Sequence, residues 1–197
     1  MKFSRLTDLF ERLEGISGRI EMTDLVCGFL GETDDESLEN VIFFLRGRVF
    51  PLYDERDLGV AEKLMVKALS EVSGAKPSEI HGLLRERGDM GLAAQKVLVS
   101  KPQTTLVRDD LTVARVGENL RRIAVIEGKG TVGKKLGYVK ELLSQSSGVE
   151  GRYLVRLILG QLRLGVGDGI LRDAIAKAFD VEAAEVERAY NLRCDMG

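Results

Sequence analysis

The chain has 197 residues, 44% of them hydrophobic and 30% charged, a balance typical of a soluble globular protein rather than a disordered one. Its formal net charge of −2 gives no overall excess of basic residues. No apolar run approaches the roughly 18 residues that a membrane-spanning helix needs, and the N-terminus lacks the apolar core of a signal peptide. We therefore expect a cytoplasmic protein that is not bound to a membrane.

Apolar residues recur at helical spacing along nearly the whole chain, and strand-like alternation is almost absent. This pattern predicts an all-α fold with about ten to twelve short helices. Thr23 is the expected N-cap of the second helix, and the stretch Pro102–Asp110 is expected to be a linker. The predicted helices span 3–14, 24–30, 37–46, 64–72, 77–87, 113–127, 132–143, 149–162, 170–179 and 183–191.

The residues that usually build metal or redox centres are too few and too scattered for such a site. Cys27 and Cys194 are isolated, and His81 is the only histidine. Neither a zinc site, a disulfide framework nor a nucleophile with its general base is indicated. We expect no catalytic and no metal-binding residue in this chain.

Positive charge is concentrated in one part of the second half. Between residues 121 and 163 nine basic side chains face only three acidic ones. A local excess of this kind can bind a polyanion even when the whole chain is near neutral. The nine are Arg121, Arg122, Lys129, Lys134, Lys135, Lys140, Arg152, Arg156 and Arg163.

The sequence repeats itself once. Residues 58–91 align with 164–197 at a constant shift of 106, and upstream the shift becomes 113, which places Gly47 on Gly160. The first copy carries seven extra residues in the loop Arg48–Asp57. We predict one domain, 1–197, built from two pseudo-twofold related lobes, about 3–91 and 116–197, with a linker at about 100–111. Because the second copy stops at Gly197 where the first continues, we interpret this end as a cut at a domain edge, with a natural terminus as the alternative.

Two glycine-rich basic segments are the candidate binding sites. The segment Glu127–Lys135 lacks the spacing of a nucleotide P-loop, yet glycines that lead into a helix expose backbone N–H groups to a phosphate. A helix-capping loop with solvated lysines is the alternative. The segment Gly160–Gly169 has four glycines and Arg163, and its repeat partner is Arg46–Arg48 with Gly59. If the preceding helix extends far enough, Arg156 and Arg163 share one face.

Three motifs together resemble the N-terminal DNA-binding domain of archaeal and eukaryotic-type ATP-dependent DNA ligases. They are the pattern Gly88–Ala94, the lysine-rich loop Lys129–Lys135, and the stretch Tyr153–Asp168, and the similarity runs to the closing residues 195–197. The resemblance implies an all-helical, pseudo-symmetric domain that grips the minor groove of nicked duplex DNA on both sides of the nick. It also implies that the remaining domains of the ligase, ATP and Mg²⁺ belong to a part of the enzyme absent from this chain.

The resemblance implies backbone contacts with DNA at Gly160, Arg163 and Gly165, while Gln161 stands where many relatives have a basic residue. We predict duplex binding with little base readout and no cofactor or catalysis in this chain alone; a sliding clamp is a further possible partner. An α-helical protein-interaction scaffold, whose loops only cap helices, and a helical metabolic enzyme are the alternatives. The predicted DNA-binding residues are Arg46, Gly47, Arg48, Gly59, Lys129, Gly130, Lys134, Lys135, Arg156, Gly160, Gln161, Arg163 and Gly165.

Overall fold

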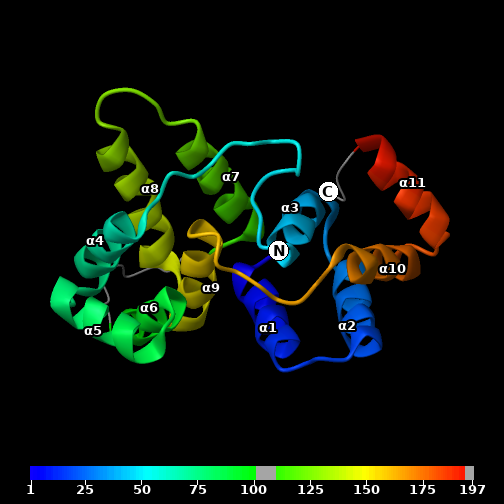
Figure 1. Ribbon diagram of the computed structural model, residues 1–197, viewed down its shortest axis with the longest axis horizontal. Helices are drawn as coiled ribbons and strands as arrows, with labels where there is room; N and C mark the ends of the chain where they lie inside the picture. The colour runs from blue at the N-terminus through cyan, green and yellow to red at the C-terminus, as the bar shows by residue number, and fades with distance from the viewer. Residues whose placement is uncertain (101–109, 194–197) are drawn as a thin grey trace.

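The fold is all-α throughout the described residues, 1–100 and 110–193 of a computed structural model (Figure 1). This confirms the predicted fold class. In these ranges the only β-type pairing is one isolated bridge between Lys2 and Thr112. The proposed linker falls largely outside the described residues, as do the closing residues 195–197. The helices are α1 (Phe3–Glu14), α2 (Arg19–Gly31), α3 (Asp35–Leu45), α4 (Glu62–Ser73), α5 (Pro77–Arg87), α6 (Met90–Val99), α7 (Val113–Ala124), α8 (Thr131–Gln145), α9 (Gly148–Ile158), α10 (Asp168–Ala178) and α11 (Ala183–Arg193).

Local signals in the sequence explain most helix ends. The Asp34 carboxylate accepts a hydrogen bond from the Ser37 amide and so caps α3. Pro77 occupies the first turn of α5, where no backbone donor is needed. Gly74 and Gly88 end α4 and α5 in the left-handed conformation. The start at Pro77 and the ends at Gly74 and Gly88 agree with the prediction, whereas α3 begins at Asp35, two residues before its predicted start.

Helix α6 was not predicted, and two predicted boundaries are wrong by four residues or more. Helix α2 begins at Arg19, and the Thr23 hydroxyl donates to the Arg19 carbonyl inside the helix instead of capping its start. Helix α9 ends at Ile158, because Gly160 takes a positive φ of 66° and turns the chain away. Arg163 therefore lies beyond the helix and does not share a helical face with Arg156.

Helices from the two halves of the chain pack against one another rather than only within their own half. Helix α10 packs on α2, and α4 packs on α8, so each half receives a helix from the other (Figure 1). Helices α3 and α7 form a further cross-half pair, as do α1 and α9. One buried apolar cluster runs through these contacts, with Phe10 of α1 edge-to-face against Tyr153 of α9 at a centroid distance of 5.2 Å.

None of the helices in the described ranges has the length and apolarity that crossing a bilayer would need. The two segments that follow α3 and α9, residues 46–61 and 159–167, contain no helix.

Candidate nucleic-acid interface

The segment after α3 lies directly against the segment after α9. Gly47 has a φ of 66°, and a Cβ atom there would lie 2.2 Å from the Leu162 carbonyl oxygen. Only glycine permits this approach of two backbones. Beside it, the Arg46 guanidinium forms an ion pair with Asp168, the first residue of α10. The structure thus brings together the two glycine segments that the sequence analysis singled out.

The segment after α9 is not helical, and alternate residues along it are buried. Leu162, Leu164 and Val166 point into the core, whereas Gln161, Arg163, Gly165 and Gly167 are exposed. The apolar residues anchor the segment, and Arg163 is presented to solvent.

The two segments together line a surface pocket of about 620 Å³, which we call the arginine groove. It includes six of the predicted DNA-binding residues. Arg46 is neutralised by Asp168, but Arg48 and Arg163 form no ion pair with any described residue. Gly160 leaves open space where a side chain would stand. The lining residues are Leu45, Arg46, Gly47, Arg48, Gly160, Leu162, Arg163, Leu164, Gly165, Val166, Gly167 and Asp168.

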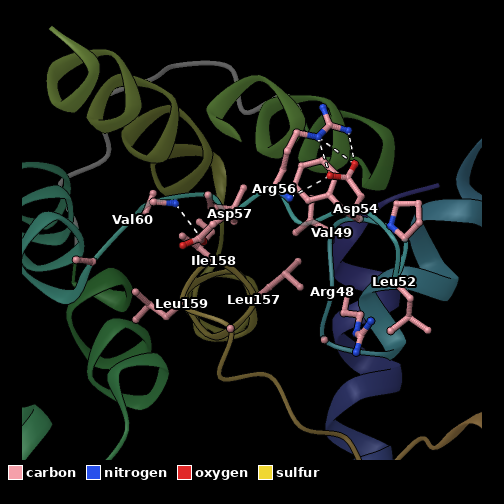
Figure 2. Close-up of a pocket in the computed structure, with 17 residues that line it drawn as sticks. Arg48, Val49, Leu52, Asp54, Arg56, Asp57, Val60, Leu157, Ile158 and Leu159 are labelled. Carbon is pink, nitrogen blue, oxygen red and sulfur yellow. Dashed lines mark hydrogen bonds and ion pairs between the residues drawn. The ribbon is translucent and has the colours of Figure 1, made fainter. Parts of the chain in front are cut away.

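A second pocket, of about 570 Å³, adjoins the arginine groove under the loop that follows α3 (Figure 2). Gly47, Arg48 and Gly160 line both pockets, so the two are continuous at these residues. The loop covers the C-terminal end of α9, and Gly59 lies at its far end. Gly59 therefore lines the second pocket and not the arginine groove.

The lysine loop before α8 is built as a helix cap. Gly130 is the N-cap of α8 with a φ of 80°, and the Thr131 hydroxyl donates to the Gly128 carbonyl. Lys129 and Lys134 are exposed and have no ion pair with a described residue. Neither lysine lines the arginine groove. The capping geometry is compatible with phosphate binding, because it leaves Lys129 and Lys134 exposed.

Two predicted DNA-binding cations are instead engaged inside the protein. Lys135 is only 8% exposed, and its Nζ donates to the Leu58 carbonyl oxygen at 2.7 Å. A Cβ at Gly59 would meet that Nζ at 2.7 Å, so the lysine fills the space that the glycine leaves. Lys135 thereby fixes the end of the loop that precedes α4.

Arg156 belongs to an ion-pair network that joins α9 to α1 and α6. Its guanidinium contacts Glu14 at 2.5 Å and Asp89 at 3.0 Å, and its side chain is 13% exposed. Tyr153 lies in the same network with its hydroxyl on Glu14, and burial raises the pKa of this phenol. A Cβ at Gly91 would lie 2.6 Å from the Arg152 carbonyl oxygen, so α6 packs on α9 only because this residue is glycine.

Sequence reasoning missed the residues that brace these segments. Asp168 ends the motif Tyr153–Asp168, but nothing in the sequence predicts its ion pair with Arg46 in the other half of the chain. The alternation of Leu162, Leu164 and Val166 with polar and glycine residues departs from helical spacing, and this signal could have corrected the predicted end of α9.

The fold and the site define an all-helical domain with a cationic, glycine-lined groove. In the described part of the chain no group of three His, Cys, Asp or Glu side chains could hold a metal ion. The family described as "DNA ligase N terminus" matches residues 2–176. The chain therefore belongs to the DNA ligase N-terminal family.

Curated relatives agree with this assignment. The chain is 44% identical to a DNA ligase of Archaeoglobus fulgidus over 198 residues, which cover 100% of this chain and 36% of the relative. It is 42% identical to a DNA ligase of Thermococcus onnurineus, covering 100% and 35%, and 42% identical to one of Methanothermobacter thermautotrophicus, covering 99% and 35%. The chain thus spans about a third of the length of these relatives.

Proposed function

We propose that this chain is the duplex-DNA-binding domain of an ATP-dependent DNA ligase and that the arginine groove contacts phosphates beside a nick. The observation that carries the proposal is the meeting of Arg48 and Arg163, from segments over a hundred residues apart, in one groove with no described carboxylate paired to either. Arginine binds phosphate through two parallel hydrogen bonds. The open space at Gly160 gives a phosphate access to the backbone.

The proposed contacts are to the DNA backbone rather than to base edges. Guanidinium groups and backbone amides hold phosphates irrespective of sequence. We therefore propose nonspecific duplex binding, in which Lys129 and Lys134 form a separate contact outside the arginine groove. Lys135 and Arg156 act in this proposal as internal braces, because both side chains are largely buried in contacts of their own.

The proposal includes an internal duplication with pseudo-twofold symmetry, which suits a duplex whose backbone has local twofold symmetry. Gly47 and Gly160, paired by the shift of 113, have the same φ of 66°. The proposed repeat aligns α4 with α10 and α2 with α8. The packing of α10 on α2 therefore corresponds to the packing of α4 on α8. The side chain nearest to Gly59 is that of Lys135, and the side chain nearest to Gly165 is that of Met22. The shift of 113 aligns Met22 with Lys135.

The chemistry of nick sealing is proposed to belong to the rest of the ligase. The chain spans about a third of its relatives, and its described residues offer no cluster of metal ligands. ATP, Mg²⁺ and the catalytic domains are accordingly assigned to the remainder of the enzyme, and this chain is assigned the task of holding the duplex.

The test is fluorescence anisotropy of a labelled nicked duplex, titrated with this chain at several salt concentrations. If four or five phosphates are neutralised, the plot of log K against log salt has a slope of about −4. Arg163→Ala is expected to weaken binding and to reduce that slope by about 1. Arg85→Ala is the matched control, because Arg85 is an exposed arginine of α5 that lines neither pocket. Equal binding by wild type and Arg163→Ala at all salt concentrations would contradict the proposal.

A further inference from the structure

A groove runs along helix α2 on the side that faces α1. The two helices lie side by side (Figure 1), and the groove between them has a volume of about 470 Å³. Its lining residues on α2 follow helical spacing from Glu21 to Glu32, so the groove extends along α2 for about 16 Å, or about three helical turns. We call it the α2 groove, and its lining residues are Arg12, Ile16, Glu21, Asp24, Leu25, Gly28, Phe29 and Glu32.

The floor of the α2 groove is apolar and open. Ile16, Leu25 and Phe29 line it, and each is only half-buried where it packs on the core. Gly28 lies on the same face of α2, and a Cβ atom there would meet nothing within 4 Å. Glycine costs a helix interior about 1 kcal/mol relative to alanine, and here its missing side chain keeps the groove open. Accessible apolar surface in a groove is typical of a binding site.

The wall that α2 contributes to the groove is acidic, with three carboxylates. Asp24 forms an ion pair with Lys177, and Glu32 forms one with Arg5, but all four side chains are exposed. Exposed ion pairs of this kind contribute little, so a ligand that brings its own cations is not excluded by them. Glu21 forms no ion pair with a described residue. This wall therefore complements a basic ligand.

The same charge disfavours nucleic acid in the α2 groove. Residues 8–39, which include every lining residue, hold ten acidic and two basic side chains. In the proposed repeat the shift of 113 aligns Glu21 with Lys134, so α2 has a carboxylate where α8 has an exposed lysine. A phosphate backbone would be repelled here. The α2 groove and the arginine groove share no lining residue, and we expect them to bind independently.

We propose that the α2 groove binds an amphipathic helix of a separate partner protein. The apolar stripe of that helix lies on Ile16, Leu25 and Phe29, and its lysine or arginine residues lie beside the acidic wall. A helix laid into an apolar groove is a recurring mode of recognition, with apolar anchors at positions i, i+3 or i+4, and i+7. The acidic wall selects basic helices over acidic ones, because an acidic flank would meet like charge.

A separate protein is the source, since the remainder of the ligase is proposed to act on the duplex and the acidic wall disfavours a position next to the duplex. This inference does not depend on DNA binding by the arginine groove. The two proposals can therefore succeed or fail separately.

The test titrates a fluorescein-labelled synthetic peptide with this chain and follows the anisotropy of the label. The peptide has about 18 residues of alanine, leucine and lysine, enough to form a helix, with a leucine stripe and lysines on one flank. Gly28→Leu fills the groove and favours the helix, and it is expected to lower peptide affinity at least about tenfold. Gly31→Leu is the matched control, because Gly31 is an equally open, exposed glycine of α2 that does not line the groove.

A second pair of variants tests the charge of the partner. Glu21→Lys is expected to weaken binding of the lysine peptide about tenfold and to strengthen binding of a peptide with glutamate in place of lysine. Glu55→Lys makes the same change in net charge at an exposed carboxylate outside the groove, and it should leave both affinities unchanged. Circular dichroism of each variant shows whether the helical fold is intact.

Each contrary outcome overturns a stated part of the inference. Equal peptide affinity of Gly28→Leu and Gly31→Leu would refute the groove as the binding site. Equal affinity of wild type for the lysine and glutamate peptides would refute a basic partner, and no saturable binding of the lysine peptide would overturn the inference as a whole. The nicked-duplex titration of Gly28→Leu is expected to match wild type, so a failure of the arginine groove to bind DNA is recognised separately.

Discussion

Two glycines with the same backbone conformation should respond very differently to an added methyl group. Gly47 and Gly160 both have a φ of 66°, a conformation that costs an alanine about 1–2 kcal/mol. At Gly160 a Cβ would meet nothing within 4 Å, so Gly160→Ala is expected to lower the free energy of unfolding by that amount alone. At Gly47 the Cβ would lie 2.2 Å from the Leu162 carbonyl oxygen, and backbone must move to admit it.

Overpacking of this kind costs about a further 1–3 kcal/mol, which brings the expected loss for Gly47→Ala to about 2–5 kcal/mol. Urea denaturation followed by circular dichroism gives both values, provided the slope of the free energy with urea is unchanged. The difference between the two variants reports the contact between the segments after α3 and after α9. Equal losses would refute the reasoning, because the two segments would then not touch at Leu162.

Three further predictions follow from the contacts of individual side chains. Lys135→Met should lower stability without changing the salt slope of DNA binding, because it removes the bond to the Leu58 carbonyl, whereas Lys134→Ala should reduce that slope in the anisotropy titration if the exposed lysine binds phosphate. Arg156→Ala removes the ion-pair partner of Asp89, while Glu14 keeps its contacts with Arg152 and Tyr153, and should cost about 1–3 kcal/mol in urea denaturation; a loss below about 0.5 kcal/mol would contradict the network. The amino group of Met1 and the Ser37 hydrogen bonds lower the pKa of Asp34 from 3.8 to about 2, so Asp34→Asn should be less stable than wild type at neutral pH, and thermal melts should show that gap closing as the pH falls from about 4 to about 2; a gap independent of pH would contradict the pairing.

The helical fold could be predicted because its signals are local. Apolar spacing of three and four residues marks each buried face, and Asp34, Pro77 and Gly88 mark helix ends through bonds within a few residues. The start of α2 was missed because Gly18, which carries no capping side chain, precedes it. The sequence alone does not distinguish a threonine inside a helix from a threonine that caps one. The hydrogen bond from the Thr23 hydroxyl to the Arg19 carbonyl oxygen shows that Thr23 lies inside α2.

The candidate site could be predicted only in part, because it depends on contacts between distant segments. Gly160 and Arg163 lie where their motif indicates, in an exposed segment beside the groove. The spacing of charged residues along the sequence does not show which cations are exposed and which are bonded inside the protein. Lys134 and Lys135 are adjacent, yet one is exposed and the other bonds to a carbonyl oxygen of a loop 77 residues away.

The central claim, that the arginine groove holds duplex DNA, is tested most directly by hydrogen–deuterium exchange of this chain with and without a nicked duplex. The account predicts slower exchange of backbone amides in residues 46–48 and 160–167, which line the groove, and no change in α5, which lies outside it. Protection confined to other surfaces, with 160–167 exchanging at the same rate in both states, would contradict the claim.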